Sequence, residues 1–392
     1  MSRTALAVLI GLCAAVVLSY LDRTAITWPA MTAQLQLGWS NSQKLLWTLA
    51  IAAGYVALMV AAGGFTNRLG GLKALQLALG WWSLCAIVTP LAAVASLPLL
   101  VATRIALGVG VAFVFPAAFN LIARRISPSH WSRAVALVAS MVSLSAALAP
   151  PLTRRLVRDH GWEAPFYWFG GAGLIAAVAW FALSRATRSP EQAERGHAIP
   201  WALLLRTPGV WGIVAGHAAY AWCIAAVFAP SPSQRLLTGR ALAVGAPLLS
   251  HFIMANTAGW VADRLLNAGR DVTAVRKLMQ AAGLGVGGLF LLITPFAASP
   301  PTAVLVLCGA SGALALTLAG FAPNALDISP TYADVIYALG SPAAALPALG
   351  AAGLALAEQA PRNGGPQFAA AAVALLGALI YFRIGSGVRR TD

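Results

Sequence analysis

The chain has 392 residues, of which 59% are hydrophobic and 9% charged, and its formal net charge is +15. Roughly a quarter of the residues of an ordinary soluble domain are charged, so this composition excludes a water-soluble fold. The positive charge does not indicate nucleic acid, because lysine and arginine collect in the cytoplasmic loops of membrane proteins. We therefore expect an all-α protein embedded in the lipid bilayer.

A membrane-spanning helix needs about 20 mostly apolar residues, and twelve such windows fit along the chain. They lie at 5–31, 45–65, 75–95, 97–123, 133–153, 165–185, 208–230, 240–262, 275–296, 302–323, 329–356 and 366–385. The opening run predicts a retained first helix and not a signal peptide, because its apolar character resumes after Asp22 and Arg23.

The most polar stretch without an apolar window, Ser184 to Ile199, separates six predicted helices from six. We therefore predict an N-terminal six-helix bundle at 1–185, a cytoplasmic linker at 186–206 and a C-terminal six-helix bundle at 207–392.

Orientation follows from the positive-inside rule. Most lysine and arginine residues fall in cytoplasmic segments when both termini are cytoplasmic, although Arg154, Arg155 and Arg158 lie in an outer loop. We expect a multi-pass protein of the cell inner (plasma) membrane. The cysteines sit singly in apolar spans, without the paired spacing of a metal site or a disulfide framework.

One motif occurs at the same place in each half. Gly63-Gly-Phe-Thr-Asn67-Arg68 follows the second window, and Gly259-Trp-Val-Ala-Asp263-Arg264 follows the eighth. Each copy places an acceptor and a guanidinium at a helix end, where they can bind neighbouring helix ends in one conformation and release them in another. We interpret Asn67, Arg68, Asp263 and Arg264 as cytoplasmic gates; the alternative is an ordinary charged interface loop.

These two segments resemble the loop signature of the major facilitator superfamily, and further segments resemble its anion:cation symporter family. That family includes the sialin and vesicular glutamate transporters and bacterial hexonate and hexuronate carriers. The further segments are Tyr20-Leu-Asp22-Arg23, Arg104-Ile-Ala-Leu-Gly108, Phe115-Pro116-Ala117, Gly161-Trp162, Phe166-Tyr167, Ala262-Asp263-Arg264, Val275-Arg276-Lys277-Leu278 and Asp327-Ile-Ser-Pro330-Thr-Tyr332-Ala333. The resemblance implies the twelve-helix fold and places substrate-binding arginines at Arg23 and Arg104.

Charged residues within a membrane cost about 2.5–3.5 kcal/mol each on insertion scales and usually mark a site. Asp22, Arg23, Arg104 and Asp334 lie inside the predicted spans. With about 1.5 Å of rise per residue, both guanidinium groups lie roughly 10–12 Å below the outer surface. Two guanidinium groups facing one cavity would bind an anion, and Asp22 leaves a local charge near +1. Alternatively, Arg23 or Arg104 pairs with Asp22 and only locks two helices.

A monocarboxylate or a sugar acid fits this charge. Tyr20 lies within a turn of Arg23, and Tyr55 occupies a position where the family usually has a tyrosine. His217 and Tyr220 lie one turn apart and are expected to face the same cavity, or else to pack with satisfied hydrogen bonds.

The sequence departs from the family at several positions. Val111 stands where proton-coupled members commonly have a glutamate, so three readings remain: Asp22 carries the proton, Asp334 carries it, or the protein is a uniporter or exchanger. The alternative for Asp334 is that it reaches the cytoplasmic surface. Ser341 replaces an asparagine that the family often places in the cavity, and Asn67 replaces an aspartate.

The sequence thus predicts a secondary transporter of a small organic anion that works by alternating access, with H⁺ or Na⁺ as candidate coupling ions. We expect a monomer without a cofactor, a metal or a nucleic-acid partner, and not an enzyme. A multidrug or metabolite efflux antiporter and a non-transporting anion receptor are the alternatives.

Overall fold

The computed structural model describes residues 2–24, 27–187, 198–229, 231–237, 241–356 and 364–389. The helices before the linker are α1 (Arg3–Thr24), α2 (Thr27–Leu37), α3 (Asn41–Leu69), α4 (Gly71–Ala95), α5 (Leu97–Val111), α6 (Val114–Arg125), α7 (Trp131–His160) and α8 (Ala164–Ala186). The later ones are α9 (Trp201–Arg206), α10 (Pro208–Phe228), α11 (Pro232–Leu236), α12 (Ala241–Asn267), α13 (Val272–Ile293), α14 (Pro300–Ala315), α15 (Phe321–Ile328), α16 (Ala333–Leu356) and α17 (Gly365–Ile384). We call these two sets the first and second halves.

Ten spans within the described residues are long and apolar enough to cross a membrane. The two remaining predicted windows, 240–262 and 329–356, correspond to α12 and α16, which are helices of 27 and 24 residues. The prediction of an all-α membrane protein is therefore confirmed.

One predicted single helix is interrupted within the described residues. The window 97–123 forms α5 and α6, which are separated at Ala112 and Phe113; Pro116 lies in the first turn of α6, where its missing N–H costs nothing. The first predicted window, 5–31, corresponds to α1 and the start of α2, and residues 25–26 between these helices lie outside the described residues.

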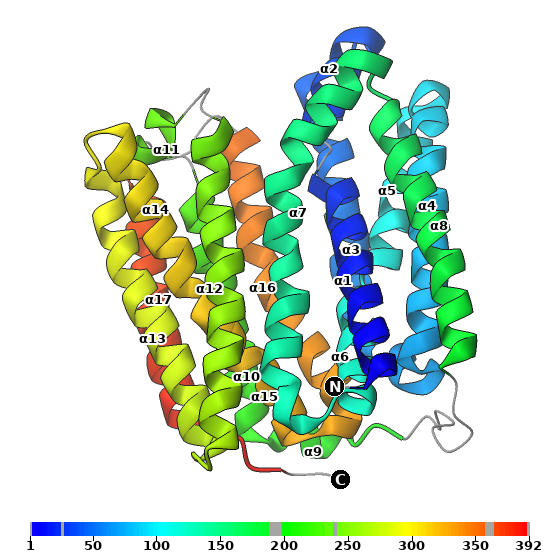
Figure 1. The fold of residues 1–392 in the computed structure, drawn as a ribbon. Coiled ribbons are helices and arrows are strands. Elements are labelled where there is room, and N and C mark those ends of the chain that lie inside the picture. Colours follow the sequence, from blue (N-terminus) through cyan, green and yellow to red (C-terminus); the bar gives the residue numbers. More distant parts are fainter. Residues whose placement is uncertain are drawn as a thin grey trace.

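The two halves stand side by side with their helices nearly parallel (Figure 1). Between the halves, α7 packs against α12, and α16 packs against α3 and α6. The N-terminus, α9 and the end of the described chain lie at one end of the molecule, which we call the linker end (Figure 1). The helix α2 lies at the opposite end.

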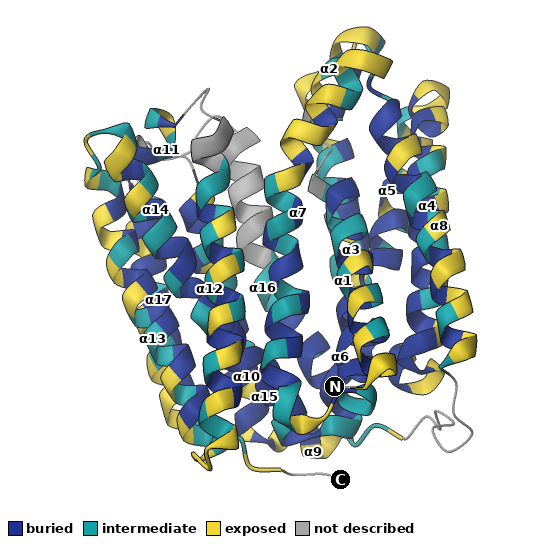
Figure 2. Ribbon diagram, in the orientation of Figure 1, coloured by how far each residue is buried: buried dark blue, intermediate teal, exposed yellow. Residues whose placement is uncertain are grey.

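Burial follows the pattern of a membrane protein (Figure 2). Large apolar side chains such as Leu77, Leu91, Ile175 and Val178 are more than half exposed on the outer faces of the helices. In contrast, thirty polar or charged side chains are buried in the described interior. Lipid is the medium in which such an apolar surface is stable, and the buried polar groups mark where to search for a site.

Helix ends and crossings follow from local chemistry. Ser40 caps α3 through a capping box with Gln43, and Ser96 caps α5. Gly54 and Gly108 face each other's helices where α3 crosses α5, since a Cβ on Gly108 would overlap the carbonyl oxygen of Ile51. The two backbones approach closely because these residues have no side chain.

Candidate functional site

A cavity of about 190 Å³ lies between the two halves. Its lining contains six of the seven predicted substrate-binding residues: Tyr20, Arg23, Tyr55, His217, Tyr220 and Ser341. The first three come from α1 and α3, and the other three come from α10 and α16. Side chains far apart in the sequence therefore converge on one space, which is what a binding site at the interface of two bundles requires.

Among the described residues that line this cavity, Arg23 is the one that is charged at neutral pH. Its guanidinium carbon lies 4.9 Å from the ring centroid of Tyr55 and 5.4 Å from that of Tyr20. Both distances fit cation–π contacts. The two tyrosines thus hold the guanidinium at the cavity wall, where its fork of donors can bind an anionic group.

Arg104 does not line the cavity, contrary to our expectation. Its side chain is fully buried on α5, and its Nη1 lies 3.8 Å from Oδ2 of Asp22, while its Cζ lies 5.7 Å from the ring centroid of Phe166. Arg23 and Arg104 were placed at one depth, but depth does not fix the direction of a side chain around a helix axis. Consecutive residues on α1 point about 100° apart, so Asp22 faces Arg104 while Arg23 faces the cavity.

The pair of Asp22 and Arg104 is unusual in its hydrogen bonding. Neither oxygen of Asp22 and none of the three side-chain nitrogens of Arg104 has a hydrogen-bond partner among the described residues. A separation of 3.8 Å is too long for a hydrogen bond. Buried charges in this state are costly, so the pair is well suited to change its protonation or its partner.

The second half supplies polar groups and rings to the cavity. The His217 ring lines the cavity, and its buried Nδ1 atom has no hydrogen-bond partner in the described chain. Ser341 donates to the carbonyl of Tyr337 at 3.1 Å. The His217 ring stacks on Phe321, with centroids 4.8 Å apart, and lies 5.0 Å from Tyr337.

Sequence reasoning missed part of this aromatic lining. Phe115, Phe321 and Tyr337 line the cavity, but only Phe115 entered the sequence argument, as part of a family motif. The sequence does not show which way these side chains face, because an aromatic residue in an apolar helix has the same pattern whether it faces lipid, a neighbouring helix or a cavity.

At the linker end, Asn67 on α3 contacts the start of α16. Its Nδ2 donates to the carbonyl of Thr331 at 2.7 Å and lies 3.3 and 3.4 Å from the two carboxylate oxygens of Asp334. Asn120 on α6 donates to the same carboxylate at 2.8 Å. Asp334 is therefore buried between two asparagines of the first half, and the alternative that it reaches the surface is wrong.

Asp263, on α12 of the second half, makes the corresponding contact with the first half. Its carboxylate accepts from the backbone N–H groups of Ser132 and Arg133 at 2.9 and 3.1 Å, and from Nε of Arg133 at 2.9 Å. It thus binds the positive end of the α7 dipole from the opposite half. Asn67 and Asp263 both contact the other half, whereas Arg68 and Arg264 are exposed, and Arg264 lies over the ring of Trp260.

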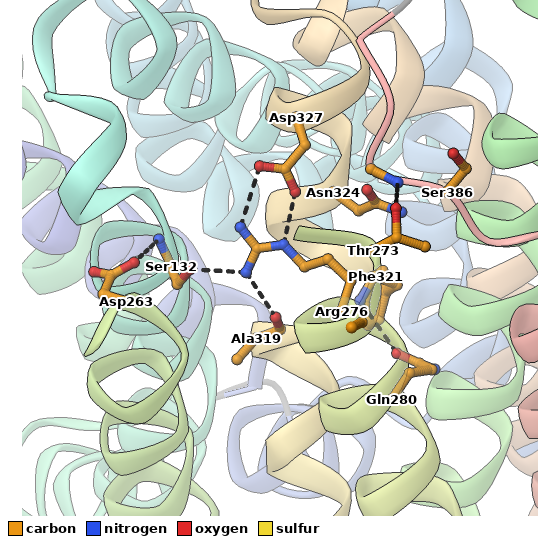
Figure 3. A network of polar contacts seen from close by, with 12 residues as sticks. Ser132, Asp263, Thr273, Arg276, Gln280, Ala319, Phe321, Asn324, Asp327 and Ser386 are labelled. Carbon is orange, nitrogen blue, oxygen red and sulfur yellow. Dashed lines mark hydrogen bonds and ion pairs between the residues drawn. The ribbon is translucent and has the colours of Figure 1, made fainter. Parts of the chain in front are cut away.

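A third connection surrounds Arg276 on α13 (Figure 3). Its Nε and Nη2 donate to the two oxygens of Asp327 at 2.6 and 3.2 Å, and its Nη1 donates to Ser132 of the first half at 2.8 Å. Arg276 and Asp327 appeared in the sequence only as motif positions without a role. The structure makes them a buried ion pair that joins α13, α15 and α7.

The sequence of this chain is similar to that of a known protein family. The family model described as Major Facilitator Superfamily matches residues 12–352. The chain belongs to the Major Facilitator Superfamily. It is 31% identical over 352 residues to the probable anion transporter 4 of Oryza sativa subsp. japonica, a match that covers 83% of this chain and 59% of the rice protein.

Two Arabidopsis thaliana proteins are similarly related. The chloroplastic ascorbate transporter is 30% identical, with 83% of this chain and 64% of that protein covered. The chloroplastic sodium-dependent phosphate transport protein 1 is 30% identical, with 86% and 71% covered. The resemblance to the anion:cation symporter type is thereby confirmed, although the matches span less than two thirds of the rice protein and of the ascorbate transporter.

Solved structures confirm the major facilitator fold. The proton:xylose symporter XylE bound to 6-bromo-6-deoxy-D-glucose superposes with a TM-score of 0.78 at 13% identity, covering 99% of this chain and 98% of that chain. FucP in the outward conformation has a TM-score of 0.71 at 15% identity, covering 98% and 100%. Together with the family match and the related transporters, this fold makes the chain a multi-pass membrane protein of a transporter superfamily and not an enzyme.

Proposed function

We propose that this protein is a secondary transporter of a small organic monoanion, a monocarboxylate or a sugar acid, and that Arg23 binds the anion. The observation that carries this proposal is the cavity between the halves, where Arg23 is the one charged residue among the described lining residues. A single positive charge neutralises one negative charge, and aromatic walls favour the carbon skeleton of an organic acid over the polar surface of phosphate. Of the two substrates in the relatives' names, ascorbate fits this reasoning better.

The remaining cavity side chains have separate roles in the proposal. Tyr20 and Tyr55 position the guanidinium of Arg23, while His217, Tyr220 and Ser341 contact the rest of the substrate from the second half. The cavity has room for about six water molecules at ~30 Å³ each, which suits a molecule of sugar-acid size.

Transport follows by alternating access, in which the bundles 1–185 and 207–392 rock around the cavity while 186–206 connects them. Asn67 with Asp334 and Asp263 with the start of α7 hold the linker end closed. Asp334 serves as a gate residue in this account, because its partners are Asn67 and Asn120 and not residues of the cavity lining. Opening the linker end requires these two contacts, and the hydrogen bond from Arg276 to Ser132, to break.

Asp22 is the proposed coupling residue, with H⁺ as the coupling ion. It lies beside Arg23 in the sequence and beside Arg104 in space, and its carboxylate has no hydrogen-bond partner among the residues that the structure describes. Protonation would release Arg104 from its buried partner and change the field at Arg23. A proton on Asp22 would lie close to the anion, so the proposal needs no glutamate at the position that Val111 occupies.

The proposed orientation puts the linker end in the cytoplasm of a cell whose inner membrane holds the protein. Basic residues near that end include Arg68, Lys73, Arg124, Arg125, Arg206, Arg270 and Lys277. The positive-inside rule favours this orientation. A cysteine in place of Arg389 should react with a membrane-impermeant maleimide only after permeabilisation.

The test is a thermal-shift series on the purified protein with D-gluconate, ascorbate, inorganic phosphate and, as a cationic control, choline. Ligands that bind the folded state raise its melting temperature. We expect gluconate or ascorbate to stabilise the wild type and to have no effect on Arg23→Gln. Stabilisation by choline alone, or equal stabilisation of Arg23→Gln, would overturn the proposal.

A further inference from the structure

His251 on α12 connects the interface of the two halves to the wall of the cavity. Its Nδ1 lies 2.9 Å from Oγ of Ser143 on α7, and its Nε2 lies 2.9 Å from the hydroxyl of Tyr220 on α10. Tyr220 lines the cavity, whereas His251 is 1% exposed and lies behind it. A continuous chain of hydrogen bonds thus leads from the first half, through the second half, to the ligand space.

The position of the proton on the His251 ring decides whether the Tyr220 hydroxyl is a hydrogen-bond donor or an acceptor toward a ligand. Both partners of His251 are neutral hydroxyl groups, and a buried imidazole in such surroundings is neutral, with one donor nitrogen and one acceptor nitrogen. If Nε2 carries the proton, it donates to the Tyr220 oxygen and leaves the Tyr220 O–H free to donate into the cavity. If Nδ1 carries it, Tyr220 donates to Nε2 and presents only lone pairs, which repel an anion.

We propose that His251 is a positioning residue that holds Tyr220 as a hydrogen-bond donor to the anion, and that Ser143 fixes the required tautomer. In this arrangement the Ser143 hydroxyl donates to Nδ1, its hydrogen-bond partner at 2.9 Å, so that Nε2 carries the proton and all three donors point toward the cavity. Hydrogen bonds aligned in one direction strengthen one another. This inference rests on the proposed anion site and identifies a residue that acts on it from outside the cavity lining.

This series of hydrogen bonds also couples the affinity for the anion to the relative position of the two halves. Ser143 belongs to the first half and His251 to the second, and the same seam between α7 and α12 contains the hydrogen bond from Asn256 to Ser140 at 3.0 Å. Rocking that separates α7 from α12 at this level removes the donor to Nδ1. His251 can then exchange tautomers, Tyr220 turns its proton toward Nε2, and the anion loses one partner as the site opens.

Two substitutions of His251 separate this role from packing. A glutamine amide can reach the place of Nε2 and donate to Tyr220, whereas an asparagine amide reaches only the place of Nδ1. We expect calorimetric titration with D-gluconate and ascorbate to show His251→Gln within about threefold of wild type. His251→Asn and Tyr220→Phe should each weaken binding about tenfold or more, the effect of losing one hydrogen bond to a charged group.

A double variant tests whether His251 acts through Tyr220. If His251 acts through Tyr220, His251→Asn combined with Tyr220→Phe should bind no more weakly than Tyr220→Phe alone. Additive losses, or wild-type affinity in His251→Asn, would overturn the proposal. Failure of the wild type to bind either acid would instead refute the proposed function.

The tautomer can be measured without any ligand. Nitrogen-15 spectra of protein labelled at histidine, assigned by the signal that His251→Gln removes, report which ring nitrogen carries the proton. We expect the Nε2–H form in the wild type and a mixture of the two forms in Ser143→Ala. A wild-type ring protonated at Nδ1 would overturn the inference whichever anion the protein binds.

Discussion

The side-chain amide of Asn67 lies 3.3 and 3.4 Å from the two carboxylate oxygens of Asp334, across the boundary between the halves. The first copy of the repeated motif has the amide where the second copy has the carboxylate of Asp263. In the first copy the acid comes instead from the opposite helix, α16. Both motif copies therefore join the halves through a carboxylate of the second half, which lies within the second copy as Asp263 but opposite the first copy as Asp334.

This contact predicts the behaviour of Asp334→Asn. Asn67 and Asn120 both donate to the carboxylate, so an asparagine would place its own N–H₂ against one of the two donors and weaken the linker-end closure. We expect the population with an open linker end to increase. Spin labels replacing Arg68 and Arg383, in a background without the four native cysteines, should show a longer distance component.

Asp159→Asn is the matched control, because it removes the same charge at the opposite end of the molecule. It should leave the spin-label distances as in the unsubstituted pair. Unchanged distances in Asp334→Asn would mean that Asp334 does not hold the gate.

The buried pair of Arg276 and Asp327 predicts a stability effect. Removing one partner of a buried ion pair leaves an unpaired charge and costs roughly 3–5 kcal/mol, so Asp327→Leu should lower the melting temperature strongly. The double variant Arg276→Met with Asp327→Leu should recover part of that loss. Arg158→Met breaks an ion pair on the surface and should leave thermal unfolding unchanged; a double variant less stable than Asp327→Leu would contradict the pairing.

The crossing of α3 and α5 predicts that Gly108 does not tolerate a side chain. A Cβ there would overlap the carbonyl of Ile51, so Gly108→Ala should destabilise the protein by about 1–3 kcal/mol through overpacking. Gly285→Ala on α13 meets nothing within 4 Å and should be neutral or slightly stabilising. Thermal unfolding of the two variants should separate them, and equal melting temperatures would refute the close crossing.

The pair of Asp22 and Arg104 predicts the behaviour of Asp22→Asn in proteoliposomes. The variant cannot release a proton at this position, so we expect an inward proton gradient to lose its stimulating effect on uptake of gluconate or ascorbate. Exchange of the labelled acid without a gradient should continue. A gradient response equal to that of the wild type would exclude Asp22 as the proton carrier.

The sequence predicted the helical spans and the family, and six of the seven residues predicted to bind substrate line the cavity. Apolar windows mark spans, and charges inside them mark a pathway. The position of Arg104 was not predictable in this way: Arg23 and Arg104 were predicted at one depth, but the packing of their helices decides which of the two side chains faces the cavity. His251 has an unremarkable apolar neighbourhood in the sequence, and only the packing of α7, α10 and α12 gives it two partners.

The most direct test of the central claim is counterflow in proteoliposomes preloaded with unlabelled D-gluconate or ascorbate and diluted into the labelled acid. The account predicts transient accumulation of label by the wild type and by Arg158→Gln, which loses an exposed cation. It predicts none by Arg23→Gln, because the charge-assisted hydrogen bonds to the anion are worth about 1.5–3 kcal/mol each. Accumulation by Arg23→Gln equal to that of the wild type would contradict the account.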